Sequence, residues 1–358
     1  MKKYNFLKGL LMFMLAFFAT TSALAQDLKL SAERCFIAPG ETGSVVLSMA
    51  NDVEVGSYTC KVTLPEGLSF VTTEGDKIKS TLLGRCENNN GLRPRCEVTA
   101  YDAQTCVITL GTIDEDVKVV PGSGEIFSFE VKASDKLPIS DIITVDKIEI
   151  GPKKYELPLT KQPSFTTYAC NSEYKLDFAV EPIQVTVGQP TKVAISLGFE
   201  KAKIAGLQFD LVLPKGLKAV NKPQVVEDRC PEYVAKLAAN GHFVVRPQGL
   251  VLNDFVGTSG ELCSFEIEAD ENFVEGSEIQ FNNIMSSTST PPYPLFHAPN
   301  LKVKVTKAGT ATGINGIESD FAAKADGIYT ISGLKVNKLV KGINIVVKDG
   351  KATKVVKK

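Results

Sequence analysis

Clustered carboxylates are the side chains here that most directly suggest chemistry, because a pair of them can divide acid and base roles on a glycan. Asp114, Glu115 and Asp116 are consecutive, and Glu271 follows Asp270. Both clusters fall in turns between strand-like segments, where acidic side chains are ordinarily just solvated. We therefore expect no catalysis from them. A calcium site at Asp114 is the alternative, although the spaced oxygen ligands of a dedicated calcium loop are missing.

The other catalytic side chains are scarce. His242 and His297 are the two histidines of the chain, and both are expected at the surface. Ser123 and Ser259 stand next to glycine, but neither lies in the Gly-x-Ser-x-Gly turn that presents a nucleophile. The sequence therefore predicts a protein that is not an enzyme and has no cofactor.

Sugar binding needs an aromatic platform backed by polar groups. The chain has no Trp, so exposed tyrosines would have to supply it, and the available ones are Tyr101, Tyr168, Tyr233 and Tyr293. Tyr293, in Pro291-Pro292-Tyr293-Pro294, is predicted to be the most exposed and is the candidate for carbohydrate binding. For each tyrosine the alternative is a place in a turn or at the edge of a core.

The eight cysteines all follow the N-terminal segment, and an even number in an exported chain suggests disulfides. Cys86 and Cys96 bracket a loop rich in Asn and Gly and could close it. Cys230 has Cys263 as its plausible partner. Cys35, Cys60 and Cys106 are expected as small apolar core residues. Cys170 is expected either to pair with one of these core cysteines or to stay free. The chain has no Cys-x-x-Cys pair, so zinc sites are unsupported.

The N-terminus predicts export. Lys2 and Lys3 precede an apolar run from Leu10 to Ala19, and Ala23-Leu24-Ala25 is a small-x-small cleavage signal. We expect a signal peptide at residues 1–25 and no transmembrane segment in the mature chain. The 40 basic residues nearly cancel the 41 acidic ones, which leaves a net charge of −1. No basic field exists to hold a polyanion, so nucleic acid is not expected as a partner.

The same series of segments occurs twice along the chain. Tyr58–Leu68 ends in Leu-Pro-Glu-Gly-Leu, and Leu207–Leu217 ends in Leu-Pro-Lys-Gly-Leu. Later, Gly-Glu-Ile-Phe-Ser-Phe-Glu-Val at 124–131 matches Gly-Glu-Leu-Cys-Ser-Phe-Glu-Ile at 260–267. Matches in the same order and at similar spacing indicate a duplicated domain.

Most of these segments alternate apolar and polar residues, which predicts strands with one buried face. Pro and Gly end the strands, because Pro cannot donate to a ladder and Gly permits the turn. The sequence therefore predicts an all-β protein of two antiparallel sandwiches. The exception is Pro231–Asn240, whose apolar spacing predicts a short helix.

The repeat sets the expected domain boundaries. They are a first sandwich at 26–152, a linker at 153–173, a second sandwich at 174–307, a linker at 308–326 and a small β module at 327–358. The segment 153–173 could also supply a terminal strand before its linker.

The two repeated motifs, Leu-Pro-x-Gly-Leu and Gly-Glu-hydrophobic-x-Ser-Phe-Glu-hydrophobic, resemble strands of the cohesin-like sandwich, a jelly-roll type fold shared with some carbohydrate-binding modules. The resemblance covers about two thirds of the chain. It implies a domain that binds a protein partner, as cohesins bind dockerins through one sheet face. No residue of this chain is matched to that face.

The C-terminus carries a second resemblance. Gly327-Ile328-Tyr329-Thr330-Ile331-Ser332-Gly333, then Gly342–Val347, then a basic end, looks like the sorting domain of type IX secretion. Asn344 stands where that family usually has Tyr. The resemblance implies passage across an outer membrane and attachment at the cell surface. The alternative is a third β module that packs on the second sandwich.

Together these features predict an extracellular or surface-displayed binding or scaffold protein whose two cohesin-like domains engage a protein partner, with duplication supplying avidity. The alternative is a carbohydrate-binding accessory protein of a polysaccharide-degrading system.

Overall fold

The computed structural model describes residues 28–73, 77–88, 95–100, 102–111, 117–151, 160–308, 327–330, 335–348 and 351–357. The predicted signal peptide, the acidic run 114–116 and Tyr101 lie outside these residues. The chain divides into two compact units, Met1–Ala308 and Gly309–Lys358. Among the described residues, no helix combines the length and the apolar character that crossing a membrane requires.

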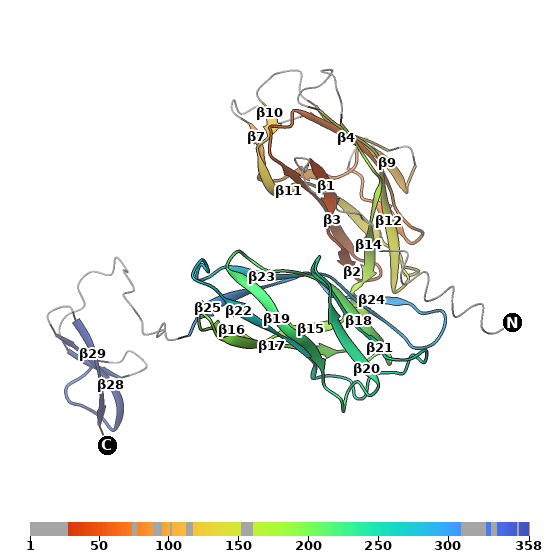
Figure 1. Ribbon diagram of the computed structural model, residues 1–358. Coiled ribbons are helices and arrows are strands. Elements are labelled where there is room, and N and C mark those ends of the chain that lie inside the picture. The colour runs from red at the N-terminus through yellow and green to blue at the C-terminus, as the bar shows by residue number, and fades with distance from the viewer. Residues whose placement is uncertain are drawn as a thin grey trace. The chain divides into compact units, whose positions relative to one another are not determined.

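In the first sandwich, two sheets pack face to face (Figure 1). One has the order β1-β3-β11-β5, with β6 also paired to β11, and comprises β1 (Lys29–Ala32), β3 (Thr42–Asn51), β11 (Gly122–Ala133), β5 (Leu68–Phe70) and β6 (Ser80–Leu82). The other has the order β2-β14-β12-β4-β9-β8, with β13 paired to β12, and comprises β2 (Cys35–Ile37), β14 (Phe165–Asn171), β12 (Ser140–Gly151), β4 (Ser57–Thr63), β9 (Thr105–Gly111), β8 (Arg95–Ala100) and β13 (Thr160–Gln162). A separate ribbon pairs β7 (Cys86–Asn88) with β10 (Val117–Val119).

The second sandwich repeats this topology, except that β19 stands where the first has β5 and β6, and that its described strands include no counterpart of the β7/β10 ribbon. Its smaller sheet has the order β15-β17-β22-β19 and comprises β15 (Asp177–Val180), β17 (Pro190–Gly198), β22 (Glu261–Ala269) and β19 (Leu217–Val225). Its larger sheet has the order β16-β25-β23-β18-β21-β20, with β24 paired to β23, and comprises β16 (Ile183–Val185), β25 (Leu301–Lys307), β23 (Glu278–Ser287), β18 (Ala205–Val212), β21 (His242–Pro247), β20 (Tyr233–Leu237) and β24 (Leu295–His297). The pairs β2/β14 and β16/β25 are parallel at the same place in both copies. The predicted duplication into tandem sandwiches is confirmed.

Each sandwich has its own core, as the alternating sequence predicts. In β18 the side chains of Leu207, Phe209 and Leu211 are buried, and Phe209 stacks on Phe243 with ring centroids 4.6 Å apart. Cys60 of β4 has the equivalent place in the first core and is 1% exposed. Burying a large apolar side chain contributes about 1.5–3 kcal/mol, so these inward faces hold the two sheets together.

Two sequence-based assignments are wrong. The segment Pro231–Asn240, predicted as a helix, contains strand β20, which pairs with β21 over its whole length. Pairing to an existing sheet edge outweighs the helix propensity of a short segment. The second is the linker assigned to 153–173: as the alternative of a terminal strand predicted, this segment supplies β13 and β14, both paired to β12, so the first sandwich extends to Asn171. A single 3-10 turn, η1 (Ser172–Tyr174), connects it to the second.

The C-terminal unit is a small antiparallel sheet, as predicted. Its order is β27-β26-β28-β29, from the strands β27 (Lys335–Val336), β26 (Gly327–Thr330), β28 (Gly342–Lys348) and β29 (Lys351–Lys357). Asn344 is fully buried there and ties down the preceding turn, because its Nδ2 donates to Val340 O at 2.7 Å and its Oδ1 accepts from Val340 N at 2.9 Å.

Candidate functional site

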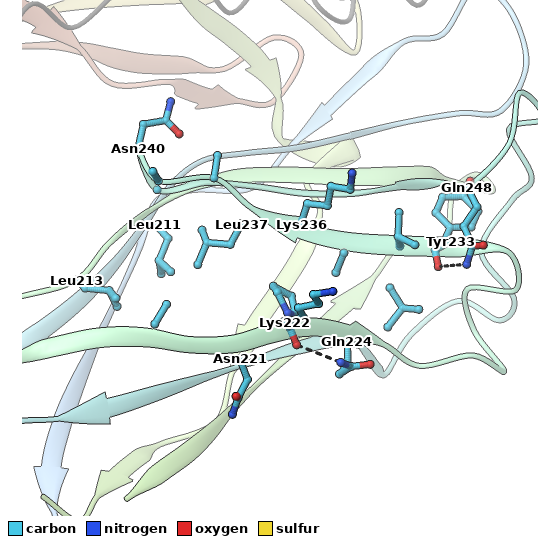
Figure 2. A pocket seen from close by; sticks show the side chains of 18 of the residues that line it. Leu211, Leu213, Asn221, Lys222, Gln224, Tyr233, Lys236, Leu237, Asn240 and Gln248 are labelled. Atoms are coloured by element: carbon cyan, nitrogen blue, oxygen red, sulfur yellow. Dashed lines mark hydrogen bonds between the residues drawn. The ribbon is translucent and has the colours of Figure 1, made fainter. Parts of the chain in front are cut away.

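The second sandwich has an open groove of about 1340 Å³. It runs between β19, an edge strand of the smaller sheet, and β20, an edge strand of the larger one (Figure 2). Residues at the margin of the core line the groove between these two strands.

The irregular path of β19 shapes this groove. The strand begins after the Pro214-Lys215-Gly216 turn, in which Gly216 has a φ of +86°. Its register with β22 then shifts between Val220 and Gln224, where Asn221 adopts a φ of +58°. A bulge of this kind bends an edge strand and turns its side chains away from the ladder. Pro223 within it cannot donate a backbone hydrogen bond, so this edge resists pairing with another strand.

The floor of the groove is apolar and its rim is polar. Leu213, Val225, Ala235 and Leu237 are partly buried and pack on the core of the second sandwich. The rim carries the polar side chains Asn221, Lys222, Gln224, Glu227, Lys236, Asn240 and Gln248. Long cationic and amide side chains over an apolar floor suit a ligand that offers both apolar contacts and hydrogen bonds.

Two rim amides are held in place by backbone carbonyls. Gln224 Nε2 donates to Lys222 O at 3.1 Å, and Gln248 Nε2 donates to Tyr233 O at 3.2 Å (Figure 2). Each donor nitrogen of these amides carries a second hydrogen, so these side chains can still serve a ligand.

Tyr233, one of the candidate sugar-stacking residues, belongs to the core. It is 1% exposed, and its hydroxyl donates to Asn253 O at 2.5 Å. Burial raises the pKa of this hydroxyl. Its ring packs against Phe255 with centroids 5.2 Å apart and offers no open face. The described lining residues of the groove include one carboxylate, that of Glu227.

Exposed apolar side chains follow the groove along the chain. Leu250 is 78% exposed and Val251 is 66% exposed, two and three residues after the rim residue Gln248. Adjacent exposed apolar side chains are a feature of interaction sites.

The remaining predicted site residues lie elsewhere. Asp270 caps a turn, since its Oδ1 accepts from Asn272 N at 2.7 Å. Tyr293 is half-buried with a φ of +60°, in the turn before β24. Within the described part of the chain, no group of three or more His, Cys, Asp or Glu side chains could hold a metal ion. The calcium loop expected at Asp114 lies outside that part.

The predicted disulfides are not formed in the structure. Cys86, Cys230 and Cys263 are free thiols, and the side chain of Cys96 lies outside the described residues. Cys86 is in β7, paired with β10, whereas Cys96 is in β8, paired with β9, so the two belong to different sheets. The cysteines expected in cores are buried, and Cys170 is a buried free thiol.

The sequence interpretation missed a buried cluster where the two sandwiches meet. His297, expected at the surface, is 2% exposed, with its ring centroid 4.5 Å from that of Tyr168. Arg34 Nη1 donates to Ile284 O at 3.2 Å, and its guanidinium carbon lies 6.0 Å from the centre of the Tyr168 ring. Burial, and secondarily the Arg34 charge, lowers the pKa of His297 from 6.5 to about 2. No local sequence signal marks these residues, because they come from separate copies.

His242, the other histidine, is partly buried on the larger sheet of the second sandwich. Its Nδ1 lies 3.1 Å from Asp210 Oδ1, and Asn283 Nδ2 donates to Asp210 Oδ2 at 2.7 Å. Burial alone would raise the pKa of Asp210, but these hydrogen bonds outweigh it and lower the pKa. A carboxylate already held by two partners on a sheet face acts as a structural anchor.

Comparison with known proteins finds neither a matching protein family nor a matching curated protein. Among solved structures, the chain is similar to the type II cohesin dyad from the adaptor ScaA scaffoldin of Acetivibrio cellulolyticus, with 11% identity, 80% of this chain and 98% of that chain covered, and a TM-score of 0.43. It is also similar to the seventh ScaB type I cohesin from Pseudobacteroides cellulosolvens, with 12% identity, 41% and 99% covered, and a TM-score of 0.32. A third is CaCohA2 from Clostridium acetobutylicum, with 11% identity, 37% and 91% covered, and a TM-score of 0.30.

Proposed function

We propose that this chain is a secreted or surface-displayed, non-catalytic binding protein whose cohesin-like sandwiches engage a protein partner, with the groove between β19 and β20 as the contact site of the second copy. The observation that carries the proposal is the groove itself, with its apolar floor and its rim of amides and lysines, together with the exposed Leu250 and Val251 that follow the rim residue Gln248 in the chain. Protein interfaces combine an apolar centre with a polar rim in this way. Two linked domains would add avidity for a partner with repeated sites.

Export supports the same proposal from the sequence side. The N-terminal segment has the features of a signal peptide. The C-terminal unit, which resembles a type IX sorting domain, is compact in its own right, as a detachable module would have to be. Deleting residues 327–358 in the native cell should leave the protein in the periplasm. Normal surface display of the truncated chain would contradict the sorting role.

The binding role is tested with the full mature chain as bait on native cell-envelope proteins, followed by mass spectrometry and titration of each captured protein. Leu250→Asp should weaken a genuine partner about tenfold or more, which is about 1.4 kcal/mol. Lys236→Glu on the rim should weaken it also. Val274→Asp is the matched control, because Val274 is 67% exposed but, unlike Leu250, is far along the chain from every residue that lines the groove. Equal affinities for all three variants would reject the groove.

The carbohydrate alternative is separated by a glycan array on the same chain. Silence across the array, together with capture of a protein that depends on Leu250, supports the protein partner. Binding to a defined glycan that is lost in Tyr293→Ala would instead support a carbohydrate-binding role.

A further inference from the structure

The segment that joins β19 to β20 is folded tightly onto the second core. The backbone N–H groups of Arg229 and Cys230 both donate to Val226 O, at 2.9 and 2.8 Å, and Tyr233 N donates to Cys230 O at 3.1 Å. This coil turns Cys230 inward, where it is fully buried. Its Sγ lies 3.8 Å from Leu262 O, a weak donor contact to the backbone of β22.

Cys263 is the next residue of β22 and is also fully buried in the same core cluster. It is paired with Val225, the last residue of β19, and Val226 N donates to Leu262 O at 2.9 Å. The end of β19 and the start of the connecting segment therefore lie against β22 at Cys263, which places both cysteines beside the same part of β22 in one apolar core cluster.

The pKa shifts of the two thiols agree with this proximity. Burial raises the pKa of Cys230 to about 12. Burial also raises the pKa of Cys263, and the neighbouring Cys230 raises it further. Negative charge on the Cys230 sulfur therefore disfavours the thiolate of Cys263.

The first sandwich supplies a natural comparison. Cys86 follows Arg85 as Cys230 follows Arg229, and its Sγ lies 3.3 Å from Ile126 O, the equivalent of Leu262 O. Where the second copy has Cys263, the first has Phe127. The first copy therefore keeps the position of the thiol but replaces its facing cysteine with an aromatic ring.

We propose that Cys230 and Cys263 are a dithiol that closes into a disulfide when the chain folds in an oxidising compartment, and that this bond fixes the segment joining the two strands that border the groove. The oxidant is a low-molecular-weight disulfide. The Cys230 thiolate attacks one of its sulfurs and releases one small thiolate. The Cys263 thiolate then attacks the Cys230 sulfur of the mixed disulfide and releases the second. Two cysteine thiols are thereby oxidised, one small disulfide is reduced to two small thiols, and the two cysteine protons pass to the released thiolates or to water.

The exchange must occur during folding, because a buried thiol with a raised pKa supplies almost no thiolate. The test therefore refolds the full mature chain in glutathione buffers of increasing oxidised fraction, quenches with acid, and alkylates all remaining thiols in denaturant. Peptide mapping by mass spectrometry should show the Cys230 and Cys263 peptides losing the label together and appearing as one cross-linked species. Cys86 should remain reduced, and should therefore be alkylated, under conditions that oxidise Cys230 and Cys263.

Three further measurements decide the proposal. Cys230→Ser and Cys263→Ser should each leave the other cysteine alkylated, whereas Cys86→Ser should leave the cross-link intact. Hydrogen exchange of residues 226–232 should be slower in the oxidised wild-type protein and should speed up again on reduction. Full labelling of both cysteines after oxidative refolding, or cross-linking of either to a different cysteine, would overturn the proposal without requiring any variant to fold.

Discussion

Arg229 Nη1 donates to the carbonyl oxygen of Leu197 at 3.2 Å, and Arg85 donates to the carbonyl of Met49, the equivalent residue of the first sandwich. In both copies the arginine therefore donates a hydrogen bond to the equivalent backbone carbonyl. Gly124 and Gly260, with φ of +143° and +112°, lie alongside the arginines. This relationship gives the Gly-Glu motif a physical basis, because its glycine adopts a backbone conformation that other residues avoid and leaves room for the arginine.

The arginine of each copy should therefore be a determinant of stability. Arg229 also donates to Gly260 O at 2.7 Å and to Val256 O at 3.0 Å, so Arg229→Ala leaves several carbonyls without this donor. We expect the free energy of unfolding to fall by about 1–3 kcal/mol, measured by urea denaturation. Arg229→Lys should recover little, since an ammonium cannot reproduce the fork of donors. Arg246→Ala, at an exposed position of β21, is the control and should change stability by no more than about 0.5 kcal/mol.

Gly216, in the turn before β19, should tolerate no side chain. Its φ is +86°, and a Cβ there would lie 2.3 Å from Phe273 N. Gly216→Ala should cost more than the roughly 1–3 kcal/mol of a strained backbone alone, because the clash is with backbone atoms. Gly257→Ala is matched in conformation, with a φ of +74°, but meets no atom within 4 Å. Equal losses in melting temperature for the two variants would show that the contact with Phe273 is unimportant.

His297 should make the protein sensitive to mild acid. The unfolded chain binds a proton at this residue near pH 6.5, whereas the buried imidazole resists protonation until about pH 2. Its contribution is present above pH 6.5 and is lost as the pH falls, at up to about 1.4 kcal/mol per pH unit. Urea titrations between pH 7 and 5 should show this slope in the wild-type protein and a smaller one in His297→Phe. The same slope in both proteins would contradict a buried neutral histidine.

The two cores should respond differently to truncation at one equivalent position. Phe209 packs on Phe243, Phe178 and Phe281, so Phe209→Ala should cost about 3–5 kcal/mol. Cys60→Ala removes a single sulfur atom from the first core and should cost less. Calorimetry that resolves the two sandwiches would check which transition moves in each variant. A larger loss for Cys60→Ala would contradict the assigned equivalence.

Much of the fold could be predicted from the sequence, because alternation along β4 and β18 reports directly which side faces a core. The duplicated Leu-Pro-x-Gly-Leu turns fixed equivalent strand ends in both copies. Strand β20 was mistaken for a helix because Tyr233, Val234 and Leu237 also fit helical spacing, and only pairing with β21 decides between the two. β14 was mistaken for linker sequence for a similar reason, since its partners lie far away in the chain.

The candidate groove could not be predicted from the sequence. It depends on which strands end as sheet edges and on the bulge between Val220 and Gln224, and neither is written in a local pattern. His297 was likewise misplaced because Pro-rich flanks suggested an exposed loop, whereas Tyr168 and Arg34 from the other copy enclose it. The pairing of Cys230 with Cys263 stays a prediction, and in the structure both are buried free thiols.

The unequal filling of the two cores also bears on how the chain folds correctly. Tandem domains with one topology risk exchanging equivalent strands during synthesis, a known failure of repeat proteins. If β4 entered the second core, Cys60 would leave a void where Phe209 belongs; if β18 entered the first, a phenyl ring would be forced into the space of a thiol. Both exchanges carry a packing penalty. The difference between Cys60 and Phe209 therefore disfavours the exchange of β4 and β18 between the two sandwiches.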